Sequence, residues 1–224
     1  MIIGVIGDLH IPYELDGYRQ WCAKIFRREK VQKYISVGDI IDHHALSFHE
    51  SEPMLKGVSG ELLDARDRLK PWFKTFPKLT ICAGNHDLIP KRQLKKVGMD
   101  AEVWMRPLAE VYDFPPGWKL VMNCQHDGVL YHHGYTSVGA NGFRLDAERR
   151  MTNTVSGHAH SNGGISASAC EHRLVWGLAV GCGVDMDSMA YAYAKDFPRK
   201  SVISCAVIKH GEPHIYYMPL GEKP

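Results

Sequence analysis

Short runs of hydrophobic residues, rich in β-branched side chains, recur along the chain and end at a glycine or a polar cluster. Runs of this length with such ends are typical of β-strands. We expect strands at 2–6, 34–37, 79–83, 129–131, 154–155, 174–180, 202–208 and 214–218.

Two longer segments, 18–29 and 61–73, carry hydrophobic residues at helical spacing. The alternation of strands and helices in the first half predicts parallel pairing, and the closely spaced strands after residue 165 predict antiparallel hairpins. The pattern therefore indicates an α/β protein, with one mixed sheet or two, in a single domain spanning 1–224. The segment 88–125 is the least regular and contains four prolines, so we expect an insertion or a lid there.

The composition is ordinary for a globular protein, with 45% hydrophobic and 23% charged residues, which excludes a disordered or collagen-like chain. Lys+Arg 27 against Asp+Glu 25 leaves a formal charge of +2, so a dedicated DNA-binding module is not indicated. We expect no signal peptide and no membrane span. The six cysteines are scattered without a C-x-x-C pair, which favours reduced thiols and a cytoplasmic location.

The chain has 13 histidines, and several of them recur in one setting. Five polar motifs each follow the end of an expected strand, which is the edge where open α/β sheets bind ligands. Any one motif could be plain turn chemistry, but five in succession are hard to explain in that way. The motifs are Asp8-Leu9-His10, Gly38-Asp39-Ile40-Ile41-Asp42, Gly84-Asn85-His86-Asp87, His132-His133-Gly134 and Gly157-His158-Ala159-His160.

These motifs offer carboxylate, amide and imidazole groups without a thiolate. Such a set suits Mn, Fe or Zn, and also Co or Ni, better than an all-oxygen Ca or Mg site. In Asp8-x-His10 and His158-x-His160 the spacing of two places both side chains on one side of an extended chain. The candidates are too many for one ion and sufficient for two ions that share a carboxylate.

As a set, the motifs resemble the five blocks of the calcineurin-like metallophosphoesterases, and the resemblance spans residues 4 to about 160. It implies a four-layer α/β/β/α sandwich of two mixed sheets, with a dinuclear metal site at the carboxyl-terminal edge of the strands. It also implies individual roles: Asp8, His10 and His160 hold the first ion, Asp39 bridges, Asn85, His133 and His158 hold the second, His86 is the catalytic histidine, and Asp42 orients it. His133 is preferred to His132 because the ligand of the family directly precedes the glycine.

The expected activity is hydrolysis of a phosphoester by a metal-bridging hydroxide, with His86 as general acid. A phosphodiesterase acting on nucleotides or nucleic acid is the first choice, and a phosphatase acting on small-molecule or protein monoesters is the alternative. His86 stands where small prokaryotic phosphodiesterases often have Cys, and His43 stands where phosphoprotein phosphatases usually have Arg. A non-catalytic metal-binding scaffold is a third hypothesis, and a single-zinc protein leaves Asp39 unexplained.

Three residues are candidates for substrate contact: His43, Arg92 and Arg144. Arg92 belongs to a basic run with Lys91, Lys95 and Lys96, which would form one face of a helix that either meets a polyanion or is simply solvated. For the cofactor we expect two divalent ions, with manganese ahead of Fe, Zn, Ni and Co. The sequence predicts no membrane partner and indicates no oligomeric state.

Overall fold

The computed structural model describes residues 1–47, 54–135, 139–188 and 200–219. Its strands form two sheets. The first sheet contains β1 (Ile2–Ile6), β2 (Lys33–Ser36), β3 (Leu79–Cys82), β4 (Trp118–Val121), β10 (Ser204–Lys209) and β11 (Glu212–Tyr217). The second contains β5 (Asn123–His126), β6 (Val129–His132), β7 (Asn153–Ser156), β8 (Gly164–Cys170) and β9 (Arg173–Ala179). The helices are α1 (Tyr18–Arg28), α2 (Val58–Thr75), α3 (Ile89–Lys96), α4 (Ala101–Trp104), α5 (Leu108–Val111), α6 (Gly142–Arg150) and a 3-10 turn, η1 (His44–Leu46).

Both sheets are mixed. The first has the order β11-β10-β1-β2-β3-β4, with β1 to β4 parallel and the β10–β11 hairpin antiparallel at one side. The second has the order β5-β6-β7-β9-β8, with β6, β7 and β9 parallel and an antiparallel strand at each edge. The predicted α/β fold with two mixed sheets is confirmed, and so are the parallel pairing of the early strands and the late hairpins.

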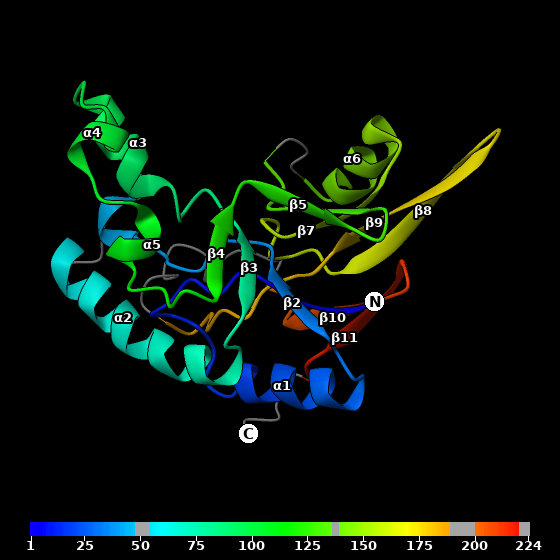
Figure 1. Cartoon of the computed structure of the whole chain (residues 1–224), viewed down its shortest axis with the longest axis horizontal. Coiled ribbons are helices and arrows are strands. Elements are labelled where there is room, and N and C mark those ends of the chain that lie inside the picture. The colour runs from blue at the N-terminus through cyan, green and yellow to red at the C-terminus, as the bar shows by residue number, and fades with distance from the viewer. Residues whose placement is uncertain (48–53, 136–138, 189–199, 220–224) are drawn as a thin grey trace.

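The alternation of side chains along β1 explains the layers. Ile3 and Val5 join a buried cluster shared with the second sheet, whereas Ile6 points to the opposite face and packs with residues of α1 and α2. α6 connects β6 to β7 and lies over the second sheet, where Glu148 accepts a hydrogen bond from the Ser168 hydroxyl of β8. Figure 1 therefore shows helices outside two facing sheets, the sandwich that the resemblance implies.

Three strands were not predicted from the sequence, and their composition explains why. β4 and β5 are four-residue edge strands; β4 lies inside the segment 88–125, and β5 begins inside it and consists of polar residues and a cysteine. β8 alternates alanine and serine and lacks the usual run of β-branched side chains. The segment 88–125 also contains α3, α4 and α5, so much of it is regular; a lid role for it stays a prediction.

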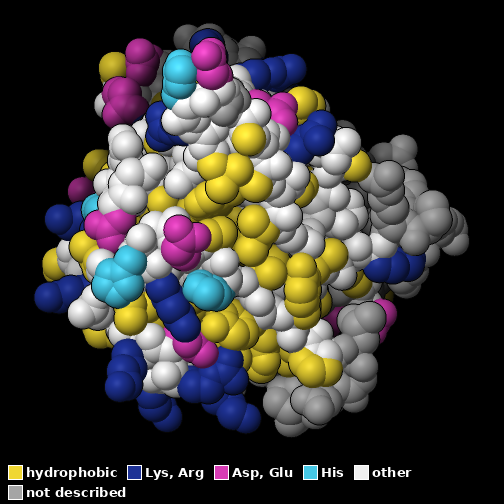
Figure 2. Space-filling model, turned by 90° about the vertical axis from the view of Figure 1, so that its right-hand side faces the viewer, with side chains coloured by type: hydrophobic (Ala, Val, Ile, Leu, Met, Phe, Trp, Pro, Cys, Tyr) yellow, Lys and Arg dark blue, Asp and Glu magenta, His cyan; other side chains and the backbone are white. Residues whose placement is uncertain are grey.

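The side of the molecule with the β8–β9 turn and the β10–β11 turn faces the viewer in Figure 2, where hydrophobic side chains form a yellow area. The exposed large hydrophobic side chains on these strands are Ile165, Leu174 and Tyr217. Among the helices within the described ranges, none has the length and apolar character needed to cross a membrane.

Candidate metal centre

The five polar motifs meet at one edge of the sandwich. Asp8 follows β1, Asp39 follows β2 and Asn85 follows β3, while His133 and His158 follow β6 and β7 of the other sheet. β1, β2 and β3 are parallel in the first sheet, and β6 and β7 are parallel in the second, so the carboxyl ends of each group lie at one edge of its sheet. The fold therefore brings together side chains that are as far apart in the chain as Asp8 and His160.

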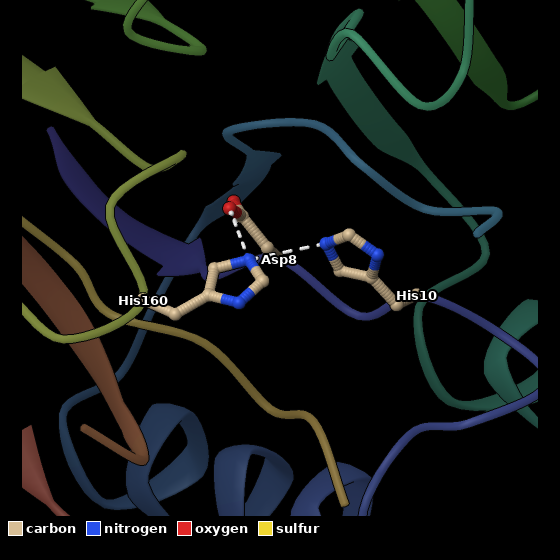
Figure 3. A group of neighbouring side chains, drawn as sticks. All are labelled: Asp8, His10 and His160. Carbon is tan, nitrogen blue, oxygen red and sulfur yellow. Dashed lines mark hydrogen bonds and ion pairs between the residues drawn. The ribbon is translucent and has the colours of Figure 1, made fainter. Parts of the chain in front are cut away.

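Asp8, His10 and His160 form the first cluster, which Figure 3 shows. Their ligand atoms lie within 4.8 Å of one another. Nε2 of His160 is 3.2 Å from the carboxylate Oδ2 of Asp8 and 3.1 Å from Nε2 of His10. Two imidazole nitrogens and a carboxylate oxygen thus converge on one small volume, as they would around a cation.

Asp39, His133 and His158 form the second cluster, again with ligand atoms within 4.8 Å. Nε2 of His133 lies 3.2 Å from Oδ2 of Asp39, 3.2 Å from Nδ1 of His158 and 2.9 Å from Oδ1 of Asn85. Every side chain that the sequence assigned to the second ion is therefore present at this point.

Asp39 lies between the two clusters. Its Oδ2 is 3.5 Å from Nε2 of His10 in the first cluster and 3.2 Å from Nε2 of His133 in the second. Its other oxygen, Oδ1, accepts a hydrogen bond of 2.8 Å from the backbone N–H of His86. One buried carboxylate therefore faces both clusters, which is the position that a bridging ligand needs.

Hydrogen bonds behind the clusters determine which nitrogen of each buried histidine faces inward. Nδ1 of His10 lies 2.5 Å from Oδ1 of Asp42, and Nδ1 of His133 lies 2.8 Å from the carbonyl oxygen of Val37. Since a carbonyl only accepts, His133 donates through Nδ1, and Nε2 is the nitrogen directed at its cluster. The Asp42 contact favours the same tautomer for His10, and this outer support is typical of metal-binding histidines.

The backbone of these loops is bent tightly. His10, Asp39, His43 and His158 have positive φ values between 46° and 68°, a region that non-glycine residues seldom occupy and that is concentrated at functional sites.

Two glycines make the close approach of the loops possible. A Cβ atom on Gly84 would lie 1.9 Å from Oδ1 of Asp39, and one on Gly157 would lie 2.1 Å from Oδ1 of Asp8. The glycines before Asn85 and His158 therefore leave the space that the two carboxylates occupy.

The electrostatics of the buried groups fit a bound cation. Asp8 and Asp39 are at most 2% exposed, and Oδ1 of Asp8 accepts no hydrogen bond within the described part of the chain. Burial lowers the pKa of the His133 imidazole, but the carboxylates of Asp39 and Asp8 outweigh it and raise the pKa to about 9. Buried anions without full compensation call for a positive partner. The two His/Asp clusters are thus consistent with a dinuclear site for divalent metal ions.

His86 and Asp42 lie beside the clusters. Nδ1 of His86 is 2.5 Å from the backbone oxygen of Asp42 and 3.2 Å from its Oδ1, while the same Oδ1 is closer to His10. Burial lowers the pKa of His86, but the hydrogen bond to Asp42 and the charge of Asp39 raise it to about 10. The His86 side chain is 23% exposed, whereas those of His10 and Asp39 are 2% exposed. His86 therefore stands at the open side of the site.

The three candidates for substrate contact have different surroundings. His43 is buried, and its Nε2 lies 2.8 Å from the Tyr112 hydroxyl, which donates to the backbone oxygen of Asp87. Arg92 is on α3, close enough to Tyr135 to lower the pKa of that phenol, although burial and nearby carboxylates raise it on balance. Arg144 is on α6, where it pairs with Glu148 at 3.6 Å. Their roles stay predictions.

Two further residues, Asp87 and Tyr135, contribute to the site; the sequence placed Asp87 in a motif without a role and did not single out Tyr135. Both oxygens of the buried Asp87 accept backbone hydrogen bonds, from Ile40 and Ile41 and from Gly84, which ties the loop after β2 to the loop after β3. Tyr135 packs against His133 with ring centroids 5.3 Å apart and is 39% exposed. Its place directly after His133-Gly134 was the available signal, but an isolated tyrosine after a turn is common.

Comparison with known proteins identifies the family. The family model described as calcineurin-like phosphoesterase matches residues 1–174, and the chain therefore belongs to the calcineurin-like phosphoesterase family. No curated protein matches the chain.

Solved structures share the fold at low sequence identity. Vps29 from Chaetomium thermophilum aligns with a TM-score of 0.50 and 13% identity over 98% of this chain and 92% of that chain. An archaeal phosphodiesterase has a TM-score of 0.47 and 13% identity, covering 97% and 100% of the two chains. YfcE, a phosphoesterase from E. coli, has a TM-score of 0.44 and 12% identity, covering 93% and 88%. At these identities the likeness concerns the fold alone.

Proposed function

We propose that the protein hydrolyses phosphoester bonds at two divalent metal ions. The observation that carries this proposal is the pair of ligand clusters that meet at Asp39, with His86 beside them at the open side. The proposed ligands are Asp8, His10 and His160 for one ion, Asn85, His133 and His158 for the other, and Asp39 for both.

Bound divalent ions would supply a hydroxide nucleophile near neutral pH and would neutralise the phosphoryl oxygens. The side chains of the protein would do the rest. Asp42 holds Nδ1 of His86 through its backbone oxygen, so Nε2 is the nitrogen left to face the substrate. His86 would donate a proton from Nε2 to the leaving oxygen, and Asp42 would serve as the positioning residue.

For the substrate we propose a phosphodiester of a nucleotide or nucleic acid. Tyr135 supports this because an exposed aromatic ring beside a metal-ligand candidate offers a surface on which a base can stack. The Tyr135 hydroxyl donates to the backbone oxygen of Ala83 at 2.6 Å, which holds the ring in place. The positive charge of Arg92, on the basic α3, acts on the Tyr135 phenol, and such a charge suits a phosphate chain.

Two other functions remain as alternatives within the same site. A phosphomonoesterase needs the same metal clusters and differs only in the groups that surround the substrate. A non-catalytic scaffold would keep the fold and the ligands without turnover. We favour an enzyme because His86 adds a proton donor that metal binding alone does not require.

The test compares bis-p-nitrophenyl phosphate with p-nitrophenyl phosphate in the presence of Mn²⁺. A higher kcat/KM for the diester supports the proposal, whereas a higher value for the monoester identifies a phosphomonoesterase. No turnover of either ester by protein that holds two metal ions identifies a scaffold.

A dinucleotide substrate tests the role of Tyr135. Tyr135→Ala should raise KM for the dinucleotide and leave bis-p-nitrophenyl phosphate almost unaffected. Tyr135→Phe is the matched control because it keeps the ring and removes only the hydroxyl.

For the metal we propose manganese, and elemental analysis of protein purified without added metal tests that choice. We also propose a cytoplasmic location. This location is supported by the cysteines: the five whose side chains the structure describes are all free thiols.

A further inference from the structure

A groove of about 510 Å³ opens where β2, β3 and β4 begin, at the ends of the strands opposite to the metal centre. Two prolines and a glycine, in the turns before β3 and β4, form part of its wall. A volume of this size is typical of a small-molecule site. The groove is lined by Gln32, Lys33, Tyr34, Pro77, Lys78, Leu79, Thr80, Pro116, Gly117 and Lys119.

Three lysines, from the starts of three neighbouring strands, line this groove. In the register of the sheet, Ile35 of β2 pairs with Thr80 of β3, and Thr80 pairs with Lys119 of β4. Lys33 is two residues before Ile35 and therefore shares its face of the sheet. That face is the one directed to the second sheet, because Ile35 belongs to the core between the sheets. Lys78, which precedes β3, lines the same groove.

The positive charge of the groove is not neutralised by the protein. Its lining contains three lysines and no carboxylate. Among the described residues, the ion pairs of the chain involve none of Lys33, Lys78 and Lys119. The field of Lys33 also reaches the second sheet, where it adds to burial in lowering the pKa of His126. Like charges gathered in a concavity repel one another, and an anion would remove that repulsion.

We propose that this groove binds a small anion carrying several phosphate groups, at a site separate from the metal centre. Three ammonium groups match the charge of an oligophosphate better than that of a single carboxylate, and lysine binds phosphate well as a point charge. An inorganic oligophosphate and the phosphate chain of a nucleotide share this chemistry. The site does not depend on the metals, because it lies at the other end of the strands.

The experiment titrates tripolyphosphate into metal-free protein at low salt and follows binding by calorimetry. The test variant is Lys33→Gln with Lys78→Gln and Lys119→Gln. The control variant is Lys24→Gln with Lys70→Gln and Lys74→Gln, which removes the same charge from α1 and α2. We expect saturable 1:1 binding by the wild type, at least ~10-fold weaker binding by the test variant and a change below ~2-fold in the control.

Two results would overturn the proposal: no saturable binding by the wild type, or equal weakening in both variants, which would mean that net charge alone attracts the anion. Lys78 and Lys119 are exposed, so we expect the test variant to fold. Circular dichroism checks its folding, and the single variant Lys119→Gln provides a milder substitution.

A nucleoside triphosphate is the ligand in the second part of the experiment. Equal affinity for both ligands assigns the site to the phosphate chain, and higher affinity for the nucleotide assigns it to a nucleotide. Hydrolysis of bis-p-nitrophenyl phosphate should be the same in all three proteins, so a failure here is distinct from a failure of the proposed function.

Discussion

The two halves of the candidate metal centre have the same kind of ligands but different supports. In the half made by Asp8, His10 and His160, a carboxylate holds His10, because Oδ1 of Asp42 lies 2.5 Å from its Nδ1. In the half around His133, a neutral backbone oxygen does the same, since the Val37 carbonyl lies 2.8 Å from Nδ1. The first half therefore depends on a side chain that one substitution can change, and the second depends on the path of the main chain.

The support also differs in charge. Asp42 brings a second buried carboxylate close to His10, while His133 has only the carboxylates that face the clusters. Asp42 also contacts the His86 side chain, so the residue that supports His10 in the first half supports the proposed proton donor as well. The two halves should therefore respond differently to substitutions.

Asp39→Asn should remove the difference by disabling both halves. The amide lacks the negative charge that both clusters share, so we expect loss of both metal ions and a fall of more than ~10³-fold in kcat/KM for a diester. Elemental analysis and steady-state kinetics measure the two effects. Retention of one ion per chain would show that Asp39 belongs to one half only. Asp16→Asn, at a 93% exposed side chain, is the control.

His86→Ala should lower kcat by about 10²- to 10⁴-fold while both metal ions stay bound, because only the proton donor is lost. The loss should be larger for a dinucleotide than for bis-p-nitrophenyl phosphate, since nitrophenolate leaves without a proton. His172→Ala removes a histidine whose side chain is 83% exposed and should change nothing. Equal losses on both substrates would contradict a role for His86 as general acid.

Asp42→Asn should weaken metal binding in the first half alone. Outer-shell partners of metal-binding histidines contribute about 10- to 100-fold in affinity, and only His10 has such a partner in Asp42. A metal titration should therefore resolve one weakened and one unchanged site. If both sites weaken equally, the two halves are coupled more tightly than their separate supports imply.

Glu29→Gln is a comparison substitution far from the metal centre. Glu29 contacts Lys209 at 2.6 Å, and Lys209 pairs with Ile2 at the start of β1, whereas the metal centre follows the end of β1. Hydrogen bonds from Lys209 and Arg28 lower the pKa of the Glu29 carboxyl to about 2. Because this value lies below that of the unfolded chain, the pair stabilises the fold above about pH 4.5, and the stabilisation is lost as the pH falls toward 2.

The pair lies near the surface, so we expect an effect below about 1 kcal/mol in the free energy of unfolding at pH 7, and none on metal binding. Urea unfolding at pH 7 and pH 3 measures it. An equal effect of Glu29→Gln at both values would show that the ion pair is not its cause.

Much of the fold followed from local pattern. β1 begins and ends where the hydrophobic run predicted, and the core strands β3, β6 and β9 lie within a residue or two of their predicted bounds. The misses were β4, β5 and β8, which are all edge strands. An edge strand needs fewer hydrophobic residues, because it is paired on one side only and is partly exposed, so its pattern is weak.

The ligand candidates were identifiable because each follows a strand end and each is of a type that binds metals. The roles of Asp87 and Tyr135 were not identifiable, since they depend on contacts with other residues: backbone N–H groups of the loop after β2 for Asp87, and the His133 ring for Tyr135. Such contacts have no signature within a short window of sequence.

The order of strands and helices and the chemistry available at each strand end follow from the amino-acid sequence, because both depend on residues that are close together in the chain. The folded chain, in contrast, sets which side chains share an ion site and places Asp39 between two clusters. It also decided that Asp42 supports His10 as well as His86, and that three lysines line one groove. These relations arise when parallel strands align their ends, which depends on pairing and packing across the whole chain.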